Sequence, residues 1–211
     1  MNNSQESFPS PKAETSQISP EQLRRIDTIL TRRLESEFGT MLFYSNEHGS
    51  FMPAKIEDIN RILNYLKLKP GQKFTDLGSG DGRWLFLAAL SKLQAEGYEA
   101  DPLIYGIAQE AKTELLKEGI LNEEDISRII MENKDLFLKD VSQSDAIIYY
   151  EGSGAGSENV EKKILQEAKS GTKVVLYGHI PEKNGFKNLK ILSTNDRASV
   201  MGFRIFEVPE K

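Results

Sequence analysis

The chain has 211 residues, which is long enough for one well-buried α/β domain and short for two. Its 27 Lys and Arg against 32 Asp and Glu leave a formal net charge of -5, which gives no general attraction to phosphates and disfavours a nucleic-acid partner. There is no Cys, only two His and no apolar run long enough to span a bilayer, so we expect a cytoplasmic protein without a metal centre or a membrane contact.

The chain begins with a polar segment that is followed by helical patterns. Residues 1–18 carry too little apolar surface to offset the entropy of ordering, so we expect a disordered tail there. Ser19, Pro20 and Gln22 have the form of a capping box, with Pro at the first helical position. Apolar residues at helical spacing then predict a helix up to Gly39.

A second apolar stripe follows Pro53 and predicts another helix, so that residues 19–72 are expected to form a layer of covering helices. Residues 73–211 are expected to form the main domain, because strand and helix patterns alternate there. Strands separated by helices imply parallel pairing. The expected elements are strand 73–77, helix 82–96, strand 103–108, helix 109–118, strand 127–132, strand 145–150, helix 157–169 and strand 172–178.

The C-terminal pattern differs, because two strand-like runs, Leu189 to Ser193 and Val200 to Val208, are separated only by a short polar loop. Such runs pair as an antiparallel hairpin. Five parallel strands and this hairpin predict an α/β fold with a seven-strand mixed sheet between two layers of helices.

The most informative segment is the turn after the first of these strands, where Gly78, Gly80 and Gly82 follow Leu77 at intervals of two. Glycine allows close backbone approach to a ligand, and a helix N-terminus behind the turn offers free N–H groups. In an open parallel sheet this edge is where ligands bind.

The spacing in this turn discriminates between ligands. A dinucleotide fingerprint requires a third Gly where the chain has Arg83, and a phosphate-binding loop requires a Gly-Lys-Ser/Thr ending that is absent. Asp76 and Asp81 also disfavour a phosphate. A carboxylate at the strand end suits a ligand that carries an ammonium and a sulfonium instead.

Positions 76–83, Asp-Leu-Gly-Ser-Gly-Asp-Gly-Arg, resemble the first motif of the class I (seven-strand) S-adenosylmethionine-dependent methyltransferases. The resemblance implies a three-layer, Rossmann-like sandwich and S-adenosylmethionine as cofactor. It also implies that Gly78, Ser79 and Gly80 contact the methionine portion of the cofactor, with Asp76 near its amino group.

The segment from His48 to Pro53 is similar to the lead-in of small protein-lysine methyltransferases. By this resemblance Phe51 would help to cover the cofactor. Ala54 replaces the hydroxyl residue that this type carries there.

The resemblance further implies an acidic residue at the end of the second strand, where a carboxylate accepts hydrogen bonds from both ribose hydroxyls. With a strand at 103–108, Ala108 occupies the usual acidic position and Glu110 is the candidate. The alternative is that Glu110 is an acid in the first turn of a helix, favoured by the helix dipole.

The segment 133–137, Asn-Lys-Asp-Leu-Phe, is similar to the family's third-strand ending. By resemblance Asp135 would recognise the adenine amino group, and the backbone N–H of Leu136 would meet a ring nitrogen. The alternative is an ordinary polar turn.

The loop after the fourth strand lies beside the transferred methyl group in this family, and here it begins with Tyr150 and Glu151. An aromatic ring and a carboxylate suit a lysine ammonium, so these two residues are the candidate catalytic pair. The alternative is that the aromatic residue packs at the rim and that the small residues 152–156 only connect to the next helix.

We therefore expect a methyltransferase that acts on a nitrogen nucleophile, with a protein lysine as the first hypothesis for the acceptor. A small-molecule N- or O-methyltransferase is the second hypothesis. A non-catalytic cofactor-binding protein is the third, because Ala108 removes the expected ribose ligand.

Overall fold

The computed structural model describes residues 18–40, 43–151, 157–178, 186, 190–195 and 202–210. The tail predicted for residues 1–18 lies outside them except for Ile18, which is buried in the core and so belongs to the folded domain. No helix in the described part of the chain is both long and apolar enough to cross a membrane.

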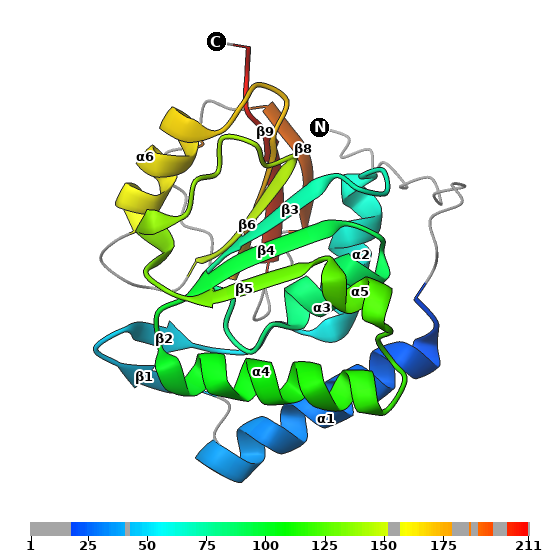
Figure 1. Ribbon diagram of the computed structural model, residues 1–211. Helices are drawn as coiled ribbons and strands as arrows, with labels where there is room; N and C mark the ends of the chain where they lie inside the picture. The colour runs from blue at the N-terminus through cyan, green and yellow to red at the C-terminus, as the bar shows by residue number, and fades with distance from the viewer. Residues whose placement is uncertain are drawn as a thin grey trace, which may run out of the picture.

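The centre of the structure is a seven-strand mixed sheet with the strand order β5-β4-β3-β6-β7-β9-β8 (Figure 1). Five strands are parallel, and β9 runs antiparallel to both of its neighbours, so the predicted C-terminal hairpin is confirmed. The strands are β3 (Lys73–Leu77), β4 (Gln94–Glu99), β5 (Ile129–Asn133), β6 (Ala146–Glu151), β7 (Lys173–Gly178), β8 (Lys190–Asn195) and β9 (Gly202–Glu207).

Helices cover both faces of this sheet, which confirms the three-layer α/β sandwich. One core cluster joins α1 (Pro20–Phe38), α2 (Ile56–Leu66) and α3 (Arg83–Leu90) to side chains such as Phe74 and Ile148. On the other face α6 (Ser157–Glu167) packs its Val160 and Ile164 against Leu77, Ile147 and Val174. Successive side chains of a strand point alternately to the two faces of the sheet, so one strand contributes to both core clusters.

Helix α1 begins with the predicted capping box, in which the Ser19 hydroxyl accepts from the Gln22 N–H and the Gln22 side chain accepts from the Ser19 N–H. Its apolar stripe enters the core, and its other side lies along α4 (Pro102–Lys117; Figure 1). Arg33 donates two hydrogen bonds to Glu114 of α4, at 2.9 and 2.6 Å, and also pairs with Glu110. Helix α1 is therefore an integral part of the domain.

The predicted strand at 103–108 is wrong, because these residues belong to α4. The Asp101 carboxylate accepts from the backbone N–H groups of Leu103 and Ile104, and Pro102 occupies the first helical turn. Apolar residues then recur at helical spacing and are buried. The true second strand is β4, which begins within the region expected as helix 82–96; the segment 109–118 continues α4.

Several short elements were not predicted, among them a hairpin and a helix. Strands β1 (Tyr44–Asn46) and β2 (Gly49–Phe51) form an antiparallel hairpin just before α2, and α5 (Glu123–Ser127) precedes β5. The hairpin lies beside the N-terminal end of α4 (Figure 1). It brings the segment around Phe51 to the edge of the sheet where β3 ends.

The burial of α1 predicts a stability effect. Leu30 is fully buried in the core, so Leu30→Ala should lower the free energy of unfolding by roughly 2 to 5 kcal/mol, through lost apolar contacts and a cavity. Chemical denaturation with urea measures this change. Leu103, which is 37% exposed on α4, is the matched control, and Leu103→Ala should cost much less. Equal small losses would contradict the packing of α1 described above.

Candidate functional site

A cavity of about 550 Å³ opens at the carboxyl ends of β3, β4 and β6. Strand β3 pairs with β4 on one side and with β6 on the other, so the direction of winding reverses there. Open α/β sheets bind ligands at such a switch point. The cavity walls come from the β1–β2 hairpin, the glycine turn after β3, the ends of β4 and β6, and the segment after β5.

The glycine turn folds back over the end of β4. The backbone N–H groups of Gly78 and Ser79 both donate to the carbonyl oxygen of Tyr98, at 3.1 and 2.9 Å. Gly97 allows this close approach, because a Cβ atom there would lie 2.7 Å from the Ser79 Cβ. Gly80 has a φ of +54°, and a Cβ atom on it would lie 2.7 Å from the ring of Phe51. A larger residue at Gly80 would therefore displace Phe51.

Asp76 is the most unusual ionisable group of the cavity. It is buried, and its Oδ2 atom has no hydrogen-bond partner; the same holds for the Ser79 hydroxyl. Burial raises the pKa of Asp76 well above its usual range, and the nearby carboxylates of Glu99 and Asp81 raise it further. Two unsatisfied polar atoms in one wall are costly unless a ligand supplies the missing hydrogen bonds.

Glu99, the last residue of β4, is the second acidic group aimed into the cavity. One of its carboxylate oxygens accepts from the Gly80 N–H at 2.8 Å, and the other accepts from the Asp101 N–H at 2.9 Å. Burial raises the pKa of Glu99, while these backbone hydrogen bonds oppose the rise. Glu99 therefore ties the glycine turn to the end of the second strand.

The remaining predicted site residues fall into three groups. Phe51, Gly78, Ser79, Gly80, Asp135, Leu136 and Tyr150 line the cavity together with Asp76. Glu151 ends β6, but its side chain and residues 152–156 lie outside the described part of the chain. Glu110 does not line the cavity.

The position expected for Glu110 is wrong, since no strand ends near it. Glu110 lies within α4, its side chain is 71% exposed, and it pairs with Arg33 of α1. The acid at the end of the second strand is Glu99. The sequence carried a signal for this, because Asp101 followed by Pro102 marks a helix start and requires the strand to end before it.

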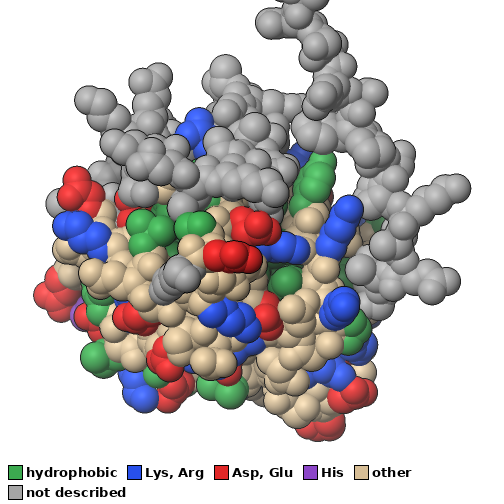
Figure 2. Space-filling model, turned by 90° about the horizontal axis from the view of Figure 1, so that it is seen from above, with side chains coloured by type: hydrophobic (Ala, Val, Ile, Leu, Met, Phe, Trp, Pro, Cys, Tyr) green, Lys and Arg blue, Asp and Glu red, His purple; other side chains and the backbone are tan. Residues whose placement is uncertain are grey.

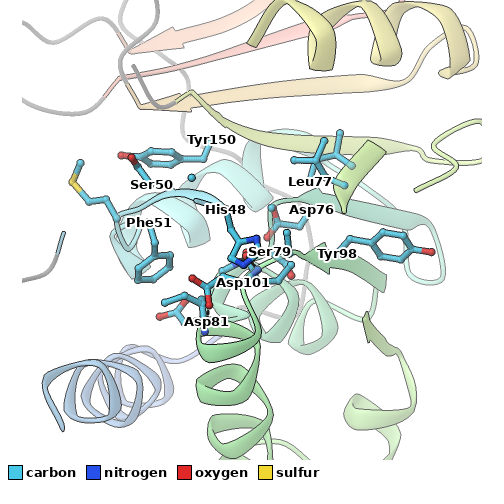
Figure 3. Close-up of a pocket in the computed structure, with 18 of the residues that line it drawn as sticks. His48, Ser50, Phe51, Asp76, Leu77, Ser79, Asp81, Tyr98, Asp101 and Tyr150 are labelled. Carbon is cyan, nitrogen blue, oxygen red and sulfur yellow. Dashed lines mark hydrogen bonds between the residues drawn. The ribbon is translucent and has the colours of Figure 1, made fainter. Parts of the chain in front are cut away.

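Figure 3 shows Phe51 and Tyr150 on one side of the cavity and Tyr98 on the other, with Asp76 and Ser79 between them. Asp135 caps the short 3-10 helix Leu136–Leu138 by accepting from the Phe137 N–H at 2.9 Å. Tyr150 is half-buried, and burial raises the pKa of its hydroxyl, which therefore stays protonated near neutral pH.

The charged side chains that line the cavity are mostly acidic. Besides Asp76 and Glu99 it includes Glu47, Asp81, Asp101 and Asp135. Among the described lining residues the single guanidinium, Arg83, is buried against the Asp81 carboxylate with an N–O distance of 2.6 Å. No group of His, Cys, Asp and Glu in the described ranges could hold a metal ion. The electrostatics of the cavity favour a cationic organic ligand.

No protein-family model matches this sequence, and a search of curated proteins finds no match to it. Solved structures do share its fold. An RNA methyltransferase from Salinibacter ruber, in complex with S-adenosyl-L-homocysteine, superposes with a TM-score of 0.61 at 21% identity, over 76% of this chain and 95% of its own. A mutant of MtNAS in complex with S-adenosylmethionine has a TM-score of 0.57 at 10% identity, over 89% of this chain and 72% of its own.

A third structure, the Escherichia coli protein yhhF, has a TM-score of 0.58 at 12% identity, over 75% of this chain and 88% of its own. These similarities, together with the strand order, define the fold as that of the class I S-adenosylmethionine-dependent methyltransferases. At these identities the likeness shows the architecture alone, because one fold carries many different activities.

The raised pKa of Asp76 predicts how stability depends on pH. Because the folded state favours the protonated carboxyl, this contribution to stability is complete below the unfolded pKa of about 4 and is lost as pH rises through the folded value. Asp76→Asn should therefore raise the midpoint of thermal unfolding of the free protein at pH 8, and the gain should shrink towards pH 4. Each 1 kcal/mol corresponds to roughly 2 to 4 °C in a chain of this size.

The matched control is Glu47→Gln, which also removes a carboxylate from the cavity lining but at a side chain that is 88% exposed. It should leave the midpoint unchanged at both pH values. A lower midpoint for Asp76→Asn at pH 8 would show that the ionised carboxylate is stabilising in the free protein.

Proposed function

We propose that this protein is an S-adenosylmethionine-dependent methyltransferase. The observation that carries the proposal is the buried carboxylate of Asp76, whose Oδ2 atom has no partner, in an acidic cavity behind the glycine turn of a methyltransferase fold. S-adenosylmethionine carries a sulfonium and an ammonium, so it supplies the positive charge that this cavity lacks. Its ammonium can donate the hydrogen bond that Asp76 is missing.

The other walls suit the remaining parts of the cofactor. Gly78, Ser79 and Gly80 present backbone atoms to its methionine portion, and Phe51 covers the turn from the hairpin side. Glu99 replaces Glu110 as the proposed acceptor for the ribose hydroxyls, because it is the acid that ends the second strand. Asp135 and Leu136 lie at the end of the third strand, where the adenine is expected.

The corrected second strand also bears on the non-catalytic alternative. That alternative depended on Ala108 at the ribose position, but Ala108 is a buried residue of α4. Glu99 supplies the missing acid. The site therefore has an acidic side chain near the end of β3, Asp76, and another at the end of β4, Glu99. We interpret the protein as an active enzyme for this reason.

The cofactor supplies an electrophilic methyl group, so the chain's own residues have only to position the acceptor and exclude water. Tyr150 lines the same cavity as the glycine turn, and its protonated hydroxyl can orient an amine nitrogen. Its ring can also contact an ammonium before the proton is lost to solvent. We assign Tyr150 to the acceptor side on these grounds, and we propose Glu151, the next residue and the last of β6, as its partner there.

A protein lysine is the acceptor that we propose. Among the described lining residues the only guanidinium is already paired with Asp81, so the cavity offers little to a phosphate backbone. On the face shown in Figure 2, acidic and basic side chains of the described surface are interspersed instead of forming a single basic patch. An amine is attracted by the acidic lining, whereas RNA is not.

The cofactor assignment is tested by calorimetric titration with S-adenosylhomocysteine. Glu99→Gln should weaken binding roughly tenfold to a hundredfold, since a charge-assisted hydrogen bond is worth about 1.5 to 3 kcal/mol. Glu110→Gln makes the same chemical change on an exposed part of α4 and is the matched control. Equal affinities for the two variants would refute the ribose assignment, and no binding by the wild-type chain would refute the proposed function.

The acceptor is identified by incubating cell extract with the protein and methyl-labelled cofactor. Label in a protein band that maps to lysine supports the proposal; label in RNA or in the small-molecule fraction overturns it in favour of those acceptors. Tyr150→Phe should then reduce turnover at least about tenfold while changing cofactor affinity less than threefold, because the hydroxyl acts on the acceptor side. Equal losses in turnover and in cofactor affinity would show that Tyr150 does not act on the acceptor side.

A further inference from the structure

One peptide unit at the edge of the cavity is held from both sides. The carbonyl oxygen of Ala54 accepts a hydrogen bond from Nη1 of Arg83, and the N–H of Lys55 donates to the Tyr177 hydroxyl at 3.3 Å. The carbonyl and the N–H belong to the same planar peptide group. Two side chains from distant parts of the sequence therefore fix the position and orientation of this group.

The two side chains connect this peptide to opposite sides of the site. Arg83 is the first residue of α3, directly after the glycine turn, and Asp81 of that turn holds its guanidinium through two carboxylate oxygens. Tyr177 is in β7, pairs in register with Tyr150 of β6, and lies 5.8 Å from its ring. The peptide thus links the cofactor side to the acceptor side.

Tyr177 also connects the sheet to α2. Its hydroxyl donates to Oδ2 of Asp58 at 3.0 Å, in the first turn of that helix. Burial raises the pKa of Tyr177 far above its ordinary value, so the hydroxyl keeps the proton that it donates. Lys55 is the N-cap of α2, so the hydrogen bond from its N–H to Tyr177 fixes the point where this helix begins.

The held peptide ends the segment that covers the cavity. Met52, Pro53 and Ala54 line the cavity without regular secondary structure, and they lead from Phe51 into α2. The hairpin residues 47–50 are exposed and bury little surface that could hold them in place. At its other end the cover is fixed by the Asn46 amide, which donates to Oδ2 of Asp101 at 2.6 Å.

We infer that Tyr177 and Arg83 are positioning residues that hold the cover segment 46–55, and with it Phe51, against the glycine turn. Neither is proposed to touch the reacting atoms. The consequence for binding depends on the proposed function, whereas the anchoring of the cover does not. Loss of the Tyr177 hydroxyl should free the Lys55 N–H and let Phe51 move away from Gly80.

The test is Tyr177→Phe, which keeps the ring packed against Trp84 and Tyr150 and removes only the hydroxyl. Without any ligand, amide hydrogen exchange in residues 51–55 should become about tenfold faster, because local opening loses one of its restraints. Asp58→Asn keeps a weaker, neutral acceptor for the Tyr177 hydroxyl. Residues 51–55 of this variant should therefore exchange at a rate between those of the wild-type chain and Tyr177→Phe.

Tyr105→Phe is the matched control, since it removes another tyrosine hydroxyl, one that donates to the Met131 carbonyl and not to a residue of the cover. It should leave exchange in 51–55 unchanged. The inference would be overturned if residues 51–55 exchanged as slowly in Tyr177→Phe as in the wild-type chain, or if the control accelerated their exchange equally.

A second measurement reports on the cavity itself. Trp84 is the only Trp of the chain and lines the cavity, so its fluorescence reports on binding of S-adenosylhomocysteine. Tyr177→Phe should weaken that binding about threefold to tenfold relative to Tyr105→Phe. Unchanged affinity would overturn the link between cover and cofactor. If the wild-type chain does not bind S-adenosylhomocysteine at all, the proposed function fails. The exchange experiment still tests whether Tyr177 anchors the cover segment.

Discussion

The uncompensated carboxylate of Asp76 is the constraint around which the site is arranged. Burying an ionised carboxylate without a partner is unfavourable, and this cost raises the pKa of Asp76 in the free protein. The neighbouring Glu99 is also buried, but backbone N–H groups satisfy it. Asp76 is therefore the acid with an oxygen that has no partner in the free protein, whereas each Glu99 oxygen already accepts one hydrogen bond and keeps a second lone pair for the proposed ribose contact. A group such as Asp76 is expected where function limits stability.

The elements around Asp76 come from separate parts of the chain. Gly97 of the neighbouring strand lets the glycine turn fold back over the sheet, and the absence of a side chain on Gly80 leaves room for the Phe51 ring beside the turn. The buried Asp81–Arg83 pair then extends the turn to the cover segment, since Arg83 also binds the carbonyl oxygen of Ala54. The glycine turn and the cavity cover are thus connected through one guanidinium.

The side of the cavity that we propose for the acceptor is built in a similar way. Tyr150 and Tyr177 are neighbours in the sheet because β6 and β7 are parallel and in register, and Trp84 of α3 packs against Tyr177 with a ring separation of 5.8 Å. These aromatic contacts place Tyr150 beside the glycine turn. The same scaffold is shared by structures at only 10 to 21% identity, and one scaffold can carry different functions, so the side chains of the cavity determine what it binds more than the fold does.

Local patterns in the sequence were enough for the fold class, the glycine turn, the first helix with its cap and the C-terminal hairpin, because each depends on short-range periodicity or on residues with special backbone freedom. The second strand was missed, since Gln94–Glu99 has little apolar character and the helix behind it is rich in apolar residues. Only the tertiary structure decided that Glu99 faces the cavity and that Glu110 pairs with Arg33. It also decided the clamp on the Ala54–Lys55 peptide, because contacts between residues more than twenty positions apart are set by packing and leave no periodic signal in the chain.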